Sequence, residues 1–304
     1  MDPAPVVPAA AERPLAQGGA PQQPVDIATY YTEAGMDYRA WSRGFNMHFG
    51  YWRRWLNPLA RERMLEEMSR QVFRRLALAP GMRVLDLGCG LGAPARRLVA
   101  EHAVALTAVT IVPWQIEKAR ALTAEMPAAP RGTVEWLLGD YAALDLPAAS
   151  YQAAFSIEAS CHAPGAAKEP FVAECARLLA PGGRLVIADG FMKGEEGMPR
   201  WYARLLGFMT RSWAVERFAN LDAFTAALER HGFAIEAVED ASFRIAPSVL
   251  HVPWVTVKFL VSELVKRDRM NRVRWGHVLA CVAAPFIGLG RPWFGYHLVT
   301  AVRR

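Results

Sequence analysis

A short apolar run ends in three closely spaced glycines, with an aspartate just before them. The run Val84–Leu87 leads into Gly88, Gly90 and Gly92, and Asp86 precedes the first glycine by two residues. A strand that stops at a glycine-rich turn and then opens a helix makes a cleft where backbone approaches a ligand closely. Dinucleotides and S-adenosylmethionine are two ligands that bind in clefts of this kind.

Charge separates these two ligands. The Asp86 carboxylate would lie near the turn, where it repels a pyrophosphate but attracts the ammonium group of a methionine moiety. A nicotinamide site also needs an acidic residue about 20 residues further on to bind the ribose. The next predicted strand, residues 104–111, carries Thr110 at its end instead. The sequence therefore favours S-adenosylmethionine over a dinucleotide and over a turn that binds nothing.

A second group of reactive side chains follows the predicted strand 151–157. Glu158 and His162 stand in the run Ile157–Pro164, at the carboxyl end of a strand, where open α/β sheets bind their ligands. We expect His162 to act as a general base or to orient one, with Glu158 as its electrostatic partner. The alternative is structural: His162 would cap a helix or bond to backbone.

Strands and helices alternate around these residues, which is typical of a parallel α/β sheet. The third predicted strand, residues 134–138, ends in Gly139, Asp140 and Tyr141. An aspartate there can accept a hydrogen bond from the exocyclic amine of adenine, and the tyrosine ring can lie beside the base. The alternative is that Asp140 is an ordinary turn residue. Two further strands are predicted, at residues 151–157 and 184–189.

The order of these motifs resembles the Class I S-adenosylmethionine-dependent methyltransferases over roughly residues 26–189. The motifs are V-L-D-L-G-C-G-x-G, G-D-Y after the third strand, and L-x-P-G-G before the fifth. Ile157–Pro164 is similar to the I-E-A-T-C-H-A-P motif of the sterol 24-C-methyltransferase branch. Thr110–Gln115 resembles the T-I-x-P-x-Q run of tocopherol, cyclopropane-lipid and sterol methyltransferases. The region 38–49 keeps the aromatic residues and the H-F pair of the sterol enzymes but lacks their acidic residue.

The resemblance implies a Rossmann-like, seven-stranded α/β sheet with aromatic N-terminal helices and a mainly helical, apolar C-terminal cap. It also implies S-adenosylmethionine as cofactor and no metal. Asp86, Gly88 and Gly90 would hold the methionine part, Thr110 and Gln115 would lie near the ribose, and Asp140 and Tyr141 would hold adenine. Further cofactor contacts are expected from Tyr31, Cys89, Ile111, Gly139 and Ser156.

Aromatic residues gather between Tyr30 and Trp55, where they could line a pocket or fill the joint between a helix and the sheet. Methylation of an alkene produces a carbocation, and aromatic faces stabilise a desolvated cation by about 1–2 kcal/mol each. We expect a terpenoid or sterol-like alkene as acceptor. The alternatives are a quinone, phenol or unsaturated acyl chain, or a non-catalytic donor- or lipid-binding module. The predicted acceptor contacts are Tyr30, Trp41, His48, Trp201 and Trp254.

Four segments are predicted along the chain. They are a disordered Pro/Ala-rich tail (1–24), an aromatic helical segment (25–78), a donor-binding core (79–190), and an acceptor-binding cap with late strands (191–304). An amphipathic helix is expected over residues 61–78, a late strand over 234–243, and a final edge strand over 293–301.

Composition bears on partners and location. The net charge of +6 and pI ≈ 9.3 allow an anionic partner, yet no nucleic-acid-binding motif accompanies them. The four cysteines lack metal or disulfide spacing, which favours a reducing, cytoplasmic location. We expect the basic stretch 266–275 to rest on anionic lipid; the alternative is a packed cap with its charges in water. The apolar run 278–289 is expected to be too short and too interrupted by Pro285 and Gly288 to span a membrane, which takes about 20 apolar residues.

Overall fold

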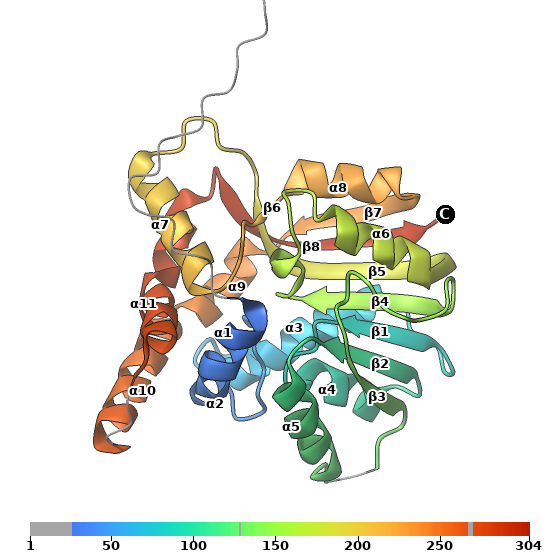
Figure 1. Ribbon diagram of the computed structural model, residues 1–304, viewed down its shortest axis with the longest axis horizontal. Coiled ribbons are helices and arrows are strands. Elements are labelled where there is room, and N and C mark those ends of the chain that lie inside the picture. The colour runs from blue at the N-terminus through green and yellow to red at the C-terminus, as the bar shows by residue number, and fades with distance from the viewer. Residues whose placement is uncertain (1–25, 128, 267–269) are drawn as a thin grey trace, which may run out of the picture.

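The computed structural model describes residues 26–127, 129–266 and 270–304. The predicted tail at 1–24 lies outside the described residues, as do residues 267–269 of the basic stretch. Within the described ranges the chain folds into one mixed sheet with helices on both faces (Figure 1). The strands are β1 (Arg83–Leu87), β2 (Ala105–Thr110), β3 (Thr133–Leu138), β4 (Tyr151–Ile157), β5 (Leu179–Met192), β6 (Ala219–Asn220), β7 (Phe233–Asp240) and β8 (Phe294–Arg303).

The sheet order is β3-β2-β1-β4-β5-β8-β7, and the two-residue strand β6 pairs with β5 off this path. Strands β1 to β5 run parallel, whereas β8 is antiparallel to both β5 and β7. The seven-stranded methyltransferase-type sheet is thus confirmed. The expectation that the last strand forms the edge is wrong, because β8 lies between β5 and β7 and leaves β7 at the edge.

Side chains alternate between two cores along the strands. Helices α3 (Arg61–Arg75), α4 (Ala93–Glu101) and α5 (Pro113–Ala124) cover one face, where Val84 and Phe155 point. Helices α6 (Glu169–Leu178) and α8 (Leu221–Arg230) cover the other, where Leu85 and Ala154 point. Because the central strands β1, β2 and β4 are buried on both faces, they carry mainly apolar runs rather than alternation with polar residues.

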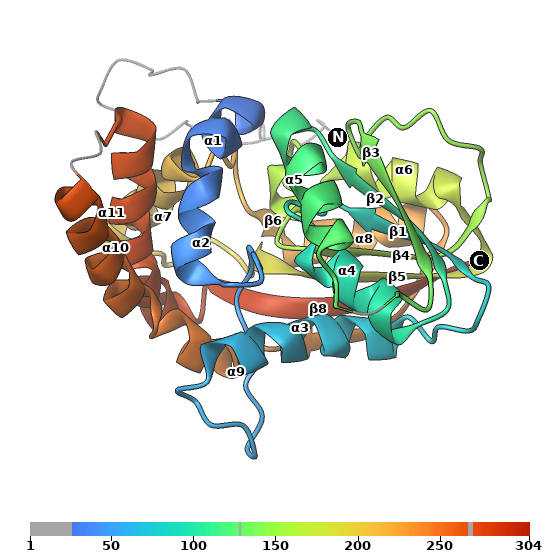
Figure 2. The ribbon, with the colours of Figure 1, turned by 90° about the horizontal axis from the view of Figure 1, so that it is seen from below.

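The remaining helices form a lobe beyond the carboxyl ends of the parallel strands (Figures 1 and 2). The predicted strand 234–243 ends early, at Asp240, because a helix begins at Ser242. Asp240 Oδ1 accepts a hydrogen bond from Ser242 N at 2.8 Å. The elements of the lobe are α1 (Ile27–Ala34), η1 (Gly35–Asp37), α2 (Tyr38–Trp41), η2 (Ser160–His162), α7 (Arg200–Ser212), α9 (Ser242–Val249), α10 (Val252–Lys266), α11 (Arg272–Ile287) and η3 (Gly288–Gly290).

Two segments of this lobe are long and apolar enough to cross a membrane by length and composition, namely Ser242–Lys266 and Arg272–Gly290. The expected interruption of the run 278–289 at Pro285 is wrong, because α11 begins upstream at Arg272 and continues through Pro285. The α-helix ends at Ile287, with Gly288 as its C-cap. Length and composition alone are weak evidence for a membrane span, because core helices meet the same criterion. In this chain α11 packs against α7 and α1, and α10 packs against α11 and α2.

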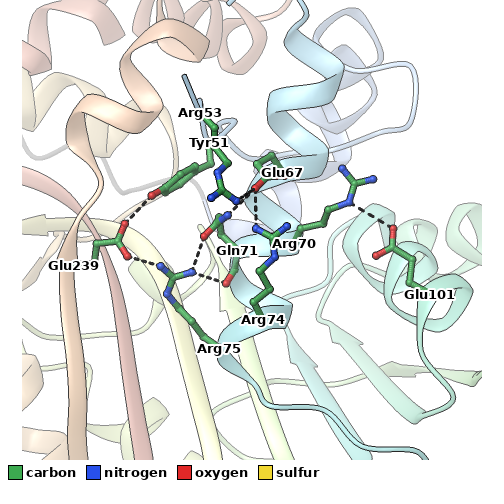
Figure 3. Close-up of polar contacts among 9 residues, drawn as sticks. All are labelled: Tyr51, Arg53, Glu67, Arg70, Gln71, Arg74, Arg75, Glu101 and Glu239. Carbon is green, nitrogen blue, oxygen red and sulfur yellow. Dashed lines mark hydrogen bonds and ion pairs between the residues drawn. The ribbon is translucent and has the colours of Figure 1, made fainter. Parts of the chain in front are cut away.

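A network of polar contacts connects α3 to the edge strand β7 (Figure 3). Glu67 accepts hydrogen bonds from Gln71 and from two arginines, and Arg75 pairs with Glu239 on β7. The hydroxyl of Tyr51 donates to the same Glu239 at 2.7 Å. The segment just after His48 is therefore fixed to both α3 and β7. The helix ends at Arg75, before the predicted end at 78, and Ala77 has a left-handed φ of 50°.

Candidate functional site

The carboxyl ends of β1 and β4 form the point where the sheet reverses its strand order. The chain moves outward from β1 to β3 and then returns to place β4 on the other side of β1. Open α/β sheets bind ligands in the crevice at such a reversal. Two cavities lie there, one of about 150 Å³ next to the glycine turn and one of about 380 Å³ under the helical lobe.

The smaller cavity has an acidic end. Asp86 is 2% exposed, and its Oδ2 has no hydrogen-bond partner among the described residues. Burial raises the pKa of this carboxyl well above its usual range. An unpartnered buried carboxylate oxygen is costly to leave without a donor. The ammonium group of a methionine moiety would supply such a donor, so the residue fits the expected ligand.

The middle of the smaller cavity offers a free amide donor. Thr110 Oγ1 donates to Gln115 Oε1 at 2.7 Å, which turns the Gln115 amide so that Nε2 is buried without a partner in the described structure. An NH₂ group can donate to a ribose hydroxyl oxygen. At the third strand, Asp140 is exposed and Oδ1 accepts from Ala142 N, while the Tyr141 hydroxyl donates to Ala159 O at 2.9 Å.

Most of the predicted cofactor residues line this smaller cavity. Ser156 and Gly139 do not: Ser156 Oγ donates to Leu87 O, and Gly139 N donates to Thr110 O, so both brace strand ends. The glycines are needed for close approach, since a Cβ on Gly90 would lie 2.9 Å from Met47 Sδ. The predicted residues that line the cavity are Tyr31, Asp86, Gly88, Cys89, Gly90, Thr110, Ile111, Gln115, Asp140 and Tyr141.

Both cavities share five wall residues, which defines a junction between them: Tyr31, Met47, His48, Glu158 and His162. The two predicted catalytic residues are thus brought together with one predicted cofactor contact and one predicted acceptor contact. Three of the five come from the segment before the core domain. A group carried in the smaller cavity would reach an acceptor in the larger one at this junction.

Glu158 sits at the junction in an uncommon backbone conformation. Its φ is 50°, the left-handed region that non-glycine residues rarely adopt, and this turn directs the side chain from the end of β4 toward the N-terminal segment. Its Oε1 accepts hydrogen bonds from Phe49 N at 2.7 Å and from the Tyr296 hydroxyl at 2.9 Å. Removal from water raises the pKa of this carboxyl to about 8.

This raised pKa predicts a pH-dependent stability. Between the usual pKa of 4.5 and about 8, the folded protein keeps the proton of Glu158 while the unfolded chain releases it. This contribution to stability is complete at low pH and is lost as pH rises toward 8, by up to about 1.4 kcal/mol per pH unit. Urea unfolding of the ligand-free protein should therefore show a steeper decline with pH for the wild type than for Glu158→Gln. Equal slopes would contradict the assignment.

His162 has both ring nitrogens engaged. Nδ1 is 3.2 Å from the Ala214 carbonyl oxygen, and Nε2 is 3.1 Å from the Tyr31 hydroxyl. A carbonyl only accepts, so Nδ1 carries the hydrogen and Nε2 accepts from the tyrosine. Glu158 and His162 do not bond to each other as the predicted pairing requires. The Glu158 carboxyl accepts hydrogen bonds from Phe49 and Tyr296, whereas the His162 ring bonds to Ala214 and Tyr31. Burial lowers the pKa of His162 to about 4.

The larger cavity is lined mainly by aromatic and aliphatic side chains. The predicted acceptor contacts Tyr30 and Trp41 both line this cavity. The Tyr30 hydroxyl forms a hydrogen bond of 2.6 Å with His277 Nδ1. Trp41 Nε1 donates to His48 O at 3.1 Å. The other aromatic wall residues are Tyr31, Tyr38, Phe49, Trp213, Phe218, Phe243, Phe259, Phe294 and Tyr296.

Trp201 and Trp254 lie outside both cavities, which corrects two predicted acceptor contacts. Their rings are 53% and 60% exposed on α7 and α10. On α10 the side facing the cavity carries Val252, Val255 and Phe259, at helical spacing. Position 254 falls outside that spacing, so its side chain points outward.

Tyr296 and His277 are two of the wall residues that were not predicted from the sequence. Tyr296 reaches Glu158 from β8, and His277 reaches Tyr30 from α11. The period-two pattern of the strand 293–301 would have shown that Tyr296 shares a face with Leu298, but not that this face adjoins β5. His277 directly precedes the apolar part of α11, residues 278–287, and a histidine at that place is a usable signal for a buried polar contact.

Comparison with known proteins supports one family. A methyltransferase-domain family model matches residues 84–183. The chain is 32% identical over 181 residues to a 2-methyl-6-phytyl-1,4-hydroquinone methyltransferase of Synechocystis sp.; the match covers 58% of this chain and spans only 55% of that relative's length. It is 30% identical over 270 residues to a 27-O-demethylrifamycin SV methyltransferase of Amycolatopsis mediterranei, which covers 85% of this chain and 90% of the relative.

A solved structure shares the fold. The mycolic acid cyclopropane synthase CmaA1, complexed with SAH and CTAB, aligns with a TM-score of 0.77 and 18% identity over 91% of this chain and 97% of that one. At this identity the likeness shows the fold alone. The Amycolatopsis relative, by contrast, is matched along most of its length at 30% identity. The chain therefore belongs to the S-adenosylmethionine-dependent methyltransferases.

Proposed function

We propose that this enzyme transfers a methyl group to an unsaturated carbon of a terpenoid or sterol-like lipid held in the larger cavity. The observation that carries the proposal is the uncharged junction together with the aromatic wall of the larger cavity that adjoins it. Burial raises the pKa of the Tyr31 and Tyr296 hydroxyls and of the Cys161 thiol, which keeps all three protonated at neutral pH. At the junction these groups offer no anionic nucleophile to trap a cation, and the aromatic faces of the larger cavity stabilise one.

The chain's residues divide the work at the junction. S-adenosylmethionine, when bound, supplies an electrophilic methyl group. Asp86 and Gln115 fit its ammonium and ribose groups, and the glycine turn admits it to the cleft. The aromatic wall holds the acceptor, excludes water and stabilises the positive charge that develops on the acceptor carbon. The protonated Glu158 adds no negative charge beside that carbon.

Labelled donor incubated with total lipid extracts tests the proposal. The expected product is a lipid that carries the labelled methyl on carbon, identified by mass spectrometry and NMR, and Asp86→Asn serves as the inactive control. Loss of the label on ether cleavage would show that the methyl group was transferred to oxygen. If S-adenosylhomocysteine binds but no lipid becomes labelled, the proposed function is wrong.

A second candidate is methylation of a hydroxyl oxygen or an aromatic ring carbon. It is favoured by the relatives, one of which is named for a hydroquinone and the other for an O-demethyl compound. The same aromatic cavity would hold such acceptors. The labelling experiment distinguishes them, because the position of the new methyl group identifies the acceptor atom directly.

We also propose that the helical lobe rests on an anionic membrane, from which the acceptor enters. Phe243 and Leu250 are 69% and 70% exposed and also line the larger cavity, so its mouth opens on an apolar surface. Lys258 and Lys266 are exposed on α10, and Lys266 pairs with Glu263. Amphipathic surfaces of this composition bind at the lipid interface. Further exposed apolar residues on α10, α11 and η3 are Trp254, Val257, Val261, Leu264, Val265, Trp275, Leu279, Val282, Phe286 and Leu289.

Val265→Glu is expected to weaken binding to vesicles containing phosphatidylglycerol by about tenfold, because a carboxylate is costly to bring into the interface. Val265 is 79% exposed, so the folded protein should tolerate the change. Flotation measures the bound fraction at low and high salt. Val238→Glu, on β7 away from the lobe, introduces the same charge and should leave binding unchanged. No flotation of the wild type at either salt would contradict membrane contact.

A further inference from the structure

His48 lies at the junction of the two cavities with one ring nitrogen occupied and the other free. Its Nδ1 is 2.8 Å from the carbonyl oxygen of Phe49. Because a carbonyl only accepts, Nδ1 carries the hydrogen and Nε2 carries the lone pair. Nε2 is buried and has no hydrogen-bond partner within the described part of the chain. Buried ring nitrogens are normally paired, so this atom marks a position for a group of the ligand.

The other histidine of the junction is in a different state. The lone pair of His162 Nε2 already accepts from the Tyr31 hydroxyl, so it must give up that contact before it can take a proton. A base needs its lone pair within reach of the proton that it removes. His48 meets this condition without rearrangement of its own hydrogen bonds.

We propose that Nε2 of His48, rather than His162, accepts the proton that the acceptor loses during methyl transfer. The assignment rests on the proposed function. The alkene π pair would form the bond to the methyl carbon while the bond from that carbon to the donor sulfur breaks, and the electron pair of the broken bond would leave with S-adenosylhomocysteine. A C–H bond next to the cationic carbon then breaks. Its electron pair becomes the new C=C bond, and its proton goes to Nε2. On a hydroxyl acceptor the O–H proton goes to the same atom.

The protonation state of His48 suits this step. Burial lowers its pKa to about 4, so the ring is neutral and its lone pair is available near neutral pH. A base this weak is adequate for an alkene acceptor, because a proton next to a carbocation is strongly acidic. His48 is 4% exposed, which keeps bulk water from competing for the lone pair.

Glu158 is the positioning residue for this histidine. Its Oε1 accepts from Phe49 N, and the carbonyl of the same Phe49 accepts from His48 Nδ1. The Tyr296 hydroxyl donates to Oε1 and fixes the carboxyl in turn. The chain of contacts therefore runs from β8 through Glu158 to the ring of His48. Glu158 thus positions His48 rather than His162, to which it makes no hydrogen bond.

The backbone around His48 is held on both sides. Gly50 N donates to Ser248 Oγ at 2.8 Å on α9, and Tyr51 N donates to Met64 O at 2.8 Å on α3. A Cβ on Gly50 would lie 2.6 Å from the Met64 carbonyl carbon, so the segment and α3 are in close contact. A base on such a support keeps its direction when the acceptor enters.

His48→Asn tests the assignment. Asparagine can keep the donor to the Phe49 carbonyl but has no atom at the Nε2 position. We expect S-adenosylhomocysteine affinity to stay within about twofold and the single-turnover rate to fall by about 10²- to 10⁴-fold. His162→Asn, the same change at the neighbouring histidine, should lower the rate by less than about tenfold. Added imidazole should partly restore His48→Ala. A rate for His48→Asn within about threefold of the wild type would overturn the proposal.

Two further readouts separate this proposal from the proposed function. Glu158→Ala should lower kcat with little change in KM, and Glu158→Gln, which keeps the accepting oxygen, should restore it. In ¹⁵N NMR of the complex with S-adenosylhomocysteine, His48 should be the Nδ1–H tautomer with Nε2 unprotonated. The Nε2–H tautomer would overturn the assignment whether or not any lipid is labelled. A wild type that labels no lipid would instead overturn the proposed function.

Discussion

Asp86→Asn is expected to weaken the binding of S-adenosylhomocysteine by about 100-fold while making the ligand-free protein more stable. The carboxylate is buried with Oδ2 unpartnered in the described structure, so it is poised for a cationic donor. A hydrogen bond to a charged group contributes about 1.5–3 kcal/mol, and each 1.4 kcal/mol is tenfold in affinity. Without a ligand the same carboxylate opposes folding, because burial raises its pKa and its ionisation at neutral pH costs free energy.

Calorimetry and thermal unfolding measure the two effects separately. The variant should gain about 1–3 kcal/mol of stability, a rise in Tm of a few degrees. Asp140→Asn is the matched control: its carboxyl is exposed and its Oδ1 accepts from Ala142 N, so it should show a smaller loss of affinity and no gain in Tm. Unchanged affinity in Asp86→Asn would contradict the contact between Asp86 and the ammonium group of the ligand.

Gly88→Ala is expected to destabilise the protein by about 2–5 kcal/mol and to abolish measurable donor binding. The φ of Gly88 is 93°, which costs an alanine about 1–2 kcal/mol, and the added Cβ would overlap the Cβ of Ala159. Relief of that overlap requires the loop after β4 to move, and this loop carries Glu158 and His162.

Gly81→Ala separates the two causes. Its φ is 82°, but a Cβ there would meet nothing within 4 Å, so only the backbone cost of about 1–2 kcal/mol applies. Urea unfolding gives both free energies, and calorimetry gives donor binding. Equal losses in the two variants would show that contact with Ala159 plays no part.

The donor side of the site was predictable from the sequence because its signals are local. A strand, a glycine turn and a helix follow one another within 20 residues, and Asp86 has a fixed place in that order. The parallel strands β1 to β4 were located to within one or two residues for the same reason. Buried parallel strands read as apolar runs between turn residues.

The acceptor side depends on tertiary packing that residue type does not reveal. Trp201 and Trp254 were chosen for their aromatic rings, but the phase of α7 and α10 decides which side chains face inward. On α7 the buried positions are Tyr202, Leu206 and Met209, and position 201 is out of phase with them. Helical periodicity applied to these segments would have rejected both tryptophans.

The state of a histidine is also invisible in the sequence. His48 and His162 were both predicted at the site from the sequence. Only the structure shows that the lone pair of His162 Nε2 accepts from Tyr31, whereas that of His48 Nε2 has no partner among the described residues. The place of β8 is a further case, because an antiparallel strand inserted between two earlier ones has no local signature.

The position of β8 also constrains the order in which the sheet can assemble. Strands β5 and β7 are joined through residues 294–303, and Tyr296 from that strand supplies a hydrogen bond to Glu158. The parallel part of the sheet, with its glycine turn, can therefore fold before the edge strand is attached, whereas the contact at Glu158 forms only when β8 is inserted.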